Sequence, residues 1–209
     1  MENIKNKMAN SKIIVEMDTE KVQGLVTRVV ERKIGGVCKV VPIREAGFDE
    51  IMKINSKCFP YWDETDTSDI TFFHKSSDSI GFFLYREKKP TAYILGANAN
   101  ACQNDFELDD EKTFRSCYAG VMPKYRRNKL YSLLTTLRNV ALIENEYDKI
   151  LFYSLNNPDT INAQLANGYE KVALVKEHYD DGSDAWLWRK DLDADEIAEE
   201  VSSLVEALK

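Results

Sequence analysis

The chain of 209 residues is long enough for one domain with additions, and its 44% hydrophobic and 11% aromatic residues are typical of a globular protein rather than a disordered one. No apolar run approaches the roughly 20 residues that span a bilayer, and the polar N-terminus lacks a secretory signal, so we expect a cytoplasmic protein that binds no membrane. The net charge of -7 argues against nucleic-acid binding. Two histidines and four widely spaced cysteines leave few ligands from which to build a metal site.

The N-terminal part of the chain contains a clear amphipathic helix. A short strand is predicted over 12–17, after which Asp18 and Thr19 offer side-chain oxygens that can cap a helix. Gly35 and Gly36 predict where this helix ends. Its apolar residues recur at helical spacing, and they are Val22, Leu25, Val26, Val29, Val30 and Ile34.

The next segment alternates between strand and helix patterns. Apolar periodicity predicts, in chain order, a strand over 37–43, a helix over 48–58, a short helix over 69–75 and two strands over 80–87 and 91–99. The last two strands are predicted to form a hairpin that turns around Lys88, Lys89 and Pro90. A polar connection, 100–112, follows.

The central segment changes from a strand to a helix. Residues 113–121 read as a strand, and Pro123 prevents its continuation because proline has no N–H to donate. Leucines at helical spacing then predict a helix from Lys129 onward. The basic turn between them, 124–128, lies where a helix presents unpaired N–H groups, so we interpret this arrangement as a phosphate-binding device.

The C-terminal third continues with a nearly continuous apolar strand over 149–155, as expected for a strand buried on both faces. Asn157 can cap a helix that ends near Gly168, and strands over 169–178 and 185–192 are predicted to pair as a hairpin. From Asp191 to Lys209 the chain holds seven acids against one lysine, together with a single apolar stripe.

The central segment resembles the coenzyme A-binding motif of the GNAT superfamily of N-acetyltransferases. The matching residues are Val121, Pro123, Tyr125, Arg126, Leu133 and Leu134. Lys129 and Tyr131 stand where the family has small residues. A second motif matches at Asn157 and at Gly168-Tyr169, with Thr160 and Gln164 in place of the usual alanine and tyrosine.

The resemblance implies an α/β (α+β) fold with a mixed, mostly antiparallel central sheet flanked by helices. It predicts three parts: an N-terminal extension, 1–36, made of a strand and an amphipathic helix; a GNAT-like acyltransferase domain, 37–190; and an acidic amphipathic helix, 191–209. The two terminal parts either build a homodimer interface or cover the sheet.

The resemblance also implies acetyl-CoA as co-substrate. The backbone of Val121 and Met122 would hold its carbonyl and pantetheine arm, and Asn157 would either hydrogen-bond the pantetheine or only cap its helix. The pyrophosphate would bind at Arg126, Arg127, Asn128, Lys129, Leu130 and Tyr131. The alternative for the basic residues is a solvated turn.

The catalytic candidates are less well marked. Glu111 is the expected general base, working through water, although it also fits a solvated acidic loop. Tyr118 lies on the central strand, where it serves either the reaction or packing. The thiolate's proton would come from Tyr153, Tyr169 or water. His74 and His178 are interpreted as packed or surface residues.

These features predict a cytoplasmic N-acetyltransferase that moves an acetyl group to a primary amine of a small molecule or peptide. Two alternatives remain at this point. One is a catalytically silent GNAT-like module that binds CoA or a partner, and the other is an enzyme that transfers a different acyl group on the same scaffold.

Overall fold

The computed structural model describes residues 18–59, 67–99, 112–179 and 181–209. The helices in this part of the chain are α2 (Thr19–Ile34), α3 (Phe48–Cys58), α4 (Thr67–Lys75), α5 (Leu130–Glu144), α6 (Pro158–Leu165) and α7 (Ala194–Glu206). The strands are β1 (Cys38–Pro42), β2 (Ser79–Arg86), β3 (Lys89–Asn98), β4 (Thr113–Val121), β5 (Lys149–Leu155), β6 (Glu170–Val175) and β7 (Ala185–Asp191). Short 3-10 turns lie at Ile43–Glu45 and Pro123–Tyr125.

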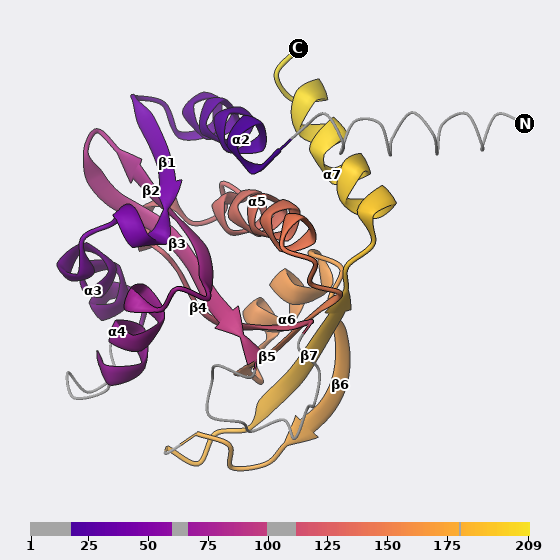
Figure 1. The fold of residues 1–209 in the computed structure, drawn as a ribbon. Helices are drawn as coiled ribbons and strands as arrows, with labels where there is room; N and C mark the ends of the chain where they lie inside the picture. The colour runs from indigo at the N-terminus through magenta and orange to yellow at the C-terminus, as the bar shows by residue number, and fades with distance from the viewer. Residues whose placement is uncertain (1–17, 60–66, 100–111, 180) are drawn as a thin grey trace, which may run out of the picture.

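These strands form one seven-stranded sheet in the order β1-β2-β3-β4-β5-β7-β6. All neighbouring pairs are antiparallel except β4 and β5, which run parallel. In Figure 1, helices α2, α5 and α7 lie on one side of the sheet, while α3 and α4 lie on the other. The predicted mixed, mostly antiparallel sheet flanked by helices is therefore confirmed.

Both faces of the sheet are covered by apolar side chains. On β2, Phe82 and Leu84 pack with α2 and α5, whereas Phe83 between them packs with α3 and α4. This follows from the two-residue period of a strand, which sends successive side chains to opposite faces. The nearly continuous apolar run of β2 is thus explained by burial on both sides.

The terminal helices pack onto the same core as α5. Val26 of α2 and Val201 of α7 belong to one buried cluster with Leu133 of α5. As predicted, Asp18 caps α2, because its carboxylate accepts a hydrogen bond of 2.9 Å from the Lys21 N–H. The terminal helices therefore cover one face of the sheet; their predicted role in a homodimer stays a prediction.

A buried lysine joins α7 to the sheet. Lys190 of β7 has a side chain only 2% exposed, and its ammonium lies 3.0 Å from the Glu200 carboxylate and 3.2 Å from that of Glu196. Both carboxylates come from α7, which explains why this acidic helix docks here rather than extending into solvent. The acidic charge of the tail is thus partly used within the fold.

Most element boundaries agree with the sequence, with a few differences. The β2–β3 hairpin turns at Glu87 and Lys88, both with positive φ, and Pro90 lies inside β3 instead of in the turn. β6 ends at Val175, before the predicted His178. The strand predicted over 12–17 lies outside the described residues. No helix in the described ranges has the length and apolarity needed to cross a membrane.

Candidate functional site

The two central strands separate after only three paired positions. β4 and β5 pair from Thr113 with Lys149 to Arg115 with Leu151, and the pairing stops there. On its other side, β4 carries a bulge, because Gly96 pairs with Ser116 while Leu95 pairs with Tyr118 and leaves Cys117 as the extra residue. Beyond Arg115 and Leu151, β4 continues to Val121 and β5 to Leu155 without pairing with each other, so a split opens toward the C-terminal ends of both strands.

The head of α5 follows the end of β4 after the 3-10 turn Pro123–Tyr125 and the rest of the basic turn. Lys129 is the N-cap residue, but its side chain makes no capping hydrogen bond, and among the described residues no side chain bonds the first-turn N–H groups; the first turn contains no acidic residue. The first backbone hydrogen bond is from Leu133 N–H to Lys129 carbonyl, at 3.0 Å. A 15-residue helix with an uncapped head attracts anions through these N–H groups and its dipole.

The basic residues of the turn surround this head. Arg126, Arg127 and Lys129 are all exposed. Arg126 Nε donates a hydrogen bond of 3.3 Å to the carbonyl of Val121, and the Asn128 side chain donates 3.1 Å bonds to the carbonyls of Tyr125 and Arg126. These bonds hold the turn in shape while they leave the guanidinium ends toward solvent. The predicted phosphate-binding residues are therefore gathered in one place.

A groove of about 270 Å³ lies between this turn and α6. Its lining residues are Val121, Tyr125, Arg126, Arg127, Lys129, Leu130, Tyr131, Ser132, Ala163, Ala166 and Asn167. Six of the predicted cofactor-binding residues are among them. Met122, Asn128 and Asn157 are not part of this lining.

The two positions that lack the expected small residues behave differently. At the first position, Lys129 has a φ of 58° and adopts the left-handed backbone that favours glycine. Arg127, two residues earlier in the same turn, does so too, with a φ of 66°. The turn thus keeps its shape without glycine at these positions. At the second position, the large side chain of Tyr131 lines the groove and reaches α6, where its hydroxyl lies 3.0 Å from the side-chain oxygen of Gln164. Burial raises the pKa of the Tyr131 phenol, which therefore stays protonated.

Two other predicted contacts are partly occupied by the fold itself. The Met122 N–H donates a hydrogen bond of 2.9 Å to the Thr91 carbonyl, so this amide is already used, contrary to the expectation that it would hold a ligand. Asn157 caps α6, since its side-chain oxygen accepts a 2.9 Å bond from the Thr160 N–H. Its predicted contact with pantetheine stays a prediction.

Two of the catalytic candidates, Tyr118 and Tyr153, lie on the two strands that border the split, and both side chains face the same side of the sheet. Tyr118 of β4 contacts Phe73 of α4 with ring centroids 6.0 Å apart, so it faces the α3 and α4 side. Tyr153 of β5 faces the same side, because its neighbour Phe152 packs on Tyr169 on the opposite side. Glu111 lies outside the described residues.

Two residues that contact predicted site residues, His178 and Cys58, were not predicted as functional. The His178 ring lies against the Tyr153 ring with centroids 4.1 Å apart. The Cys58 thiol donates to the Val121 carbonyl at 3.3 Å; burial raises its pKa, and Arg126 acts in the opposite direction. No signal in the sequence marks either residue, because both reach the site through contacts between elements far apart in the chain.

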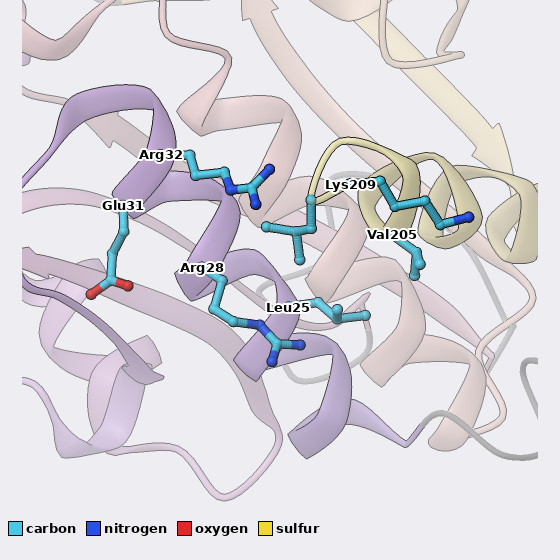
Figure 2. A pocket seen from close by; sticks show the side chains of 7 residues that line it. Leu25, Arg28, Glu31, Arg32, Val205 and Lys209 are labelled. Atoms are coloured by element: carbon cyan, nitrogen blue, oxygen red, sulfur yellow. The ribbon is translucent and has the colours of Figure 1, made fainter.

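A larger groove lies elsewhere among the described residues. It has a volume of about 690 Å³ and is lined by Leu25, Arg28, Glu31, Arg32, Val205, Leu208 and Lys209, residues of α2 and of the C-terminal end of the chain. Figure 2 shows how Arg28 and Arg32 of α2 lie opposite Val205 and Lys209. The Arg32 guanidinium of this groove already has a partner, because it donates a hydrogen bond of 3.2 Å to the Ala207 carbonyl at the end of α7. We therefore interpret this groove as the seam between two packed helices and the smaller groove as the candidate site.

No protein-family model and no curated protein matches the sequence. Solved structures do match the fold. The chain resembles ribosomal-protein-S18-alanine N-acetyltransferase from Escherichia coli with a TM-score of 0.60 and 14% identity, over 75% of this chain and 94% of that chain.

Two further structures give the same result. Arabidopsis thaliana NAA60 in complex with acetyl-CoA matches with a TM-score of 0.60 and 11% identity, over 75% of this chain and 99% of that chain. An acetyltransferase of the GNAT family from Streptococcus pneumoniae matches with a TM-score of 0.57 and 12% identity, again over 75% and 99%. At such identities the likeness establishes the fold, and the chain therefore has the fold of the GNAT acetyltransferases.

Proposed function

We propose that this protein is a cytoplasmic N-acetyltransferase that moves an acetyl group from acetyl-CoA to a primary amine of a small molecule or peptide. The observation that carries the proposal is the split between β4 and β5 beside the uncapped, cation-flanked head of α5. The unpaired N–H groups at a helix N-terminus can bind the phosphates of a nucleotide diphosphate. An opening between two strands can hold an extended acyl carrier. The fold shared with acetyltransferases supports the same conclusion.

The residues fit the phosphate part of CoA best. The N–H groups of Leu130 and Tyr131 would bind the pyrophosphate together with the side chains of Arg126, Arg127 and Lys129, as charge-assisted hydrogen bonds. Asn128 would hold the turn rather than the ligand, because its side-chain amide already bonds two carbonyls. Val121 would line the entry to the split, where Asn157 lies at the end of β5.

Bound acetyl-CoA would supply a thioester whose acyl carbon is already activated toward an amine. In the transfer, the amine nitrogen forms the new C–N bond, the C–S bond breaks, the amine gives up its proton and the sulfur gains one. The protein must therefore orient the two reactants and accept and donate these protons. Tyr153 and Tyr118, which lie on the two strands bordering the split and face the same side of the sheet, are the described residues that we propose for proton donation to sulfur and for orientation of the acceptor.

The test is binding followed by turnover. Purified protein is titrated with acetyl-CoA while its melting temperature is recorded, and thiol release is then measured with a panel of primary amines and amino-terminal peptides. We expect a rise in melting temperature and thiol release with at least one amine class. If millimolar CoA leaves the melting temperature unchanged, every CoA-based function for this protein is refuted.

One observation favours a second candidate, a catalytically silent module that binds CoA or a partner. The Tyr131 hydroxyl bonded to Gln164 occupies space between α5 and α6 beside the groove. The two candidates differ in a single outcome of the same experiment. A thermal shift with CoA but no thiol release from acetyl-CoA for any amine would support the silent module over an enzyme that uses acetyl-CoA.

A further inference from the structure

The connection between β6 and β7 places an imidazole ring beside the split. His178 follows β6, which ends at Val175, and its ring lies against the Tyr153 ring with centroids 4.1 Å apart. Tyr153 lies on β5 just beyond Leu151, the last residue of that strand that pairs with β4. His178 therefore lies at the split, on the side of the sheet that Tyr153 and Tyr118 face.

The position of this ring is defined by its neighbours. Besides Tyr153, the Tyr179 ring meets it edge to face, with centroids 4.9 Å apart. The connection itself is held by a turn, in which the Tyr179 N–H donates a 3.2 Å bond to the Ser183 carbonyl and the Gly182 N–H donates a 2.8 Å bond to the Tyr179 carbonyl. His178 and Tyr153 are nevertheless both partly exposed, so a dissolved molecule can reach them.

The charged groups on the elements next to His178 are Glu170 on β6, Lys176, Glu177, Asp181 and Asp184 on the connection, and Arg189 on β7. Asp180 lies outside the described residues. Lys176 pairs with Asp184 at 2.6 Å. Hydrogen bonds lower the pKa of both Asp181 and Asp184, so these carboxylates stay charged across the neutral range. Of the side-chain types described here, imidazole is the one that ordinarily changes charge near neutral pH.

Acyl transfer needs a proton acceptor close to the proton donor. The C–N bond that forms and the C–S bond that breaks share one carbon, so the two proton-transfer groups must lie within a few ångströms of each other. The rings of His178 and Tyr153 meet this requirement. The other histidine does not, because His74 on α4 donates from Nε2 to the Ala46 carbonyl at 2.8 Å and its Nδ1 is buried.

We propose that His178 is the proton acceptor for the attacking amine, and thus a catalytic residue. This inference rests on the proposed function and adds the base to it. The amine attacks as the free base; as its nitrogen bonds the acyl carbon, one N–H proton passes to an imidazole nitrogen of His178. As the C–S bond breaks, Tyr153 gives its hydroxyl proton to sulfur. Water then takes the proton from His178 and returns one to Tyr153.

The test is the pH dependence of kcat for an amine that gives thiol release. With saturating acetyl-CoA and amine, we expect wild-type kcat to fall toward acidic pH over the range where imidazoles take up a proton, about pH 6–7. His178→Gln should lower kcat by about 100-fold or more at neutral pH, remove this acidic fall and leave the CoA dissociation constant within about twofold. Imidazole added to His178→Ala should restore part of the rate, because the position is partly exposed.

His74→Gln is the matched control, since glutamine keeps a donor for the Ala46 carbonyl, and its kcat and pH profile should match the wild type. Wild-type kcat and profile in His178→Gln would refute this inference and leave the proposed function standing. A lower kcat with an unchanged profile and no rescue by imidazole would show a structural role and would also overturn it. If the wild type releases no thiol with any amine, both this inference and the proposed function fail.

If His178→Gln does not fold, chemical modification decides. The chain has only two histidines, so His178 is the single imidazole of the His74→Gln variant. Diethyl pyrocarbonate, which acylates imidazole, should abolish thiol release by this variant, and hydroxylamine should restore it. Full activity after modification would overturn the inference.

Discussion

The Tyr131 hydroxyl donates a hydrogen bond of 3.0 Å to the side-chain oxygen of Gln164, and this bond joins α5 to α6 beside the candidate groove. Tyr131 stands where the GNAT motif has a small residue, and Gln164 stands where it often has a tyrosine. The two departures from the motif are therefore in contact with each other. We interpret them as a coupled pair that narrows the space available to a CoA arm.

Replacing Tyr131 with alanine should widen this space. We expect Tyr131→Ala to raise the affinity for CoA by about tenfold, equivalent to about 1.4 kcal/mol, and to lower the free energy of unfolding by about 3 kcal/mol through the cavity it leaves. Calorimetry with CoA and urea unfolding measure the two effects. Tyr131→Phe is the matched control: it keeps the ring, should cost about 1 kcal/mol and should leave affinity nearly unchanged. Weaker CoA binding by the alanine variant would mean that the ring packs on the ligand instead.

Arg126 and Lys124 offer a test of the phosphate site within one turn. Both are exposed and basic, but only Arg126 lines the groove. We expect Arg126→Ala to weaken CoA binding by about 1.5–3 kcal/mol, since it removes a charge-assisted contact, and Lys124→Ala to change it by less than about 0.5 kcal/mol. CoA titrations at low and high salt should show that affinity falls more with salt in the wild type than in Arg126→Ala. Equal losses in both variants would mean that the turn attracts CoA only through its overall charge.

The sequence predicted those features of the fold that depend on local pattern. The bounds of α3, β4 and β5 agree with prediction because each has an apolar period bounded by a capping residue, a proline or a polar turn. Asp18 and Asn157 were predicted as helix caps for the same local reason, and both are. The head of α5 could likewise be placed, since a strand, a proline and a leucine-lined helix follow one another in the chain.

The features that could not be predicted depend on residues distant in sequence. The bulge at Cys117 arises from pairing with β3, and the contact between Tyr153 and His178 depends on how the β6–β7 connection folds back. Arg138 is polar, so its position on α5 reads as solvent-exposed unless one knows that β4 and Tyr169 enclose it. Periodicity gives the apolar face of a helix, but it does not say which polar residues are enclosed with it.

Alkaline pH should reveal the contact between Tyr85 and Glu50. The Tyr85 hydroxyl donates to the Glu50 carboxylate, which also accepts a 3.1 Å bond from the Gly47 N–H at the start of α3. Burial, together with the Glu50 hydrogen bond, raises the pKa of Tyr85 to about 12, above the value of about 10 for an unfolded chain. The stability that this group contributes is therefore fully present below about pH 10 and is lost as the pH rises toward 12.

Urea unfolding of the wild type and of Tyr85→Phe at several pH values tests this expectation. The variant should be less stable than the wild type by about 1 kcal/mol near neutral pH, and the difference should shrink between about pH 10 and 12. Tyrosinate absorbance, followed in the same samples, should show one fewer late-titrating group in the variant. A difference that stays constant across this range would show that Tyr85 titrates like a free tyrosine.

Tyr153 lies across the split from Tyr118, and phenylalanine at each position separates their roles. If Tyr153 donates the proton to the leaving sulfur, Tyr153→Phe should lower kcat by about 100-fold or more without changing KM for the acyl-CoA donor. Tyr118→Phe should instead raise KM for the amine, because Tyr118 contacts α4 on the acceptor side. Tyr147, a tyrosine just before β5 at the paired end of the strands, is the matched control, and Tyr147→Phe should leave both constants within about twofold. An unchanged kcat in Tyr153→Phe would assign the proton to water or to another residue, because a group that takes part in the rate-limiting transfer cannot be removed without slowing it.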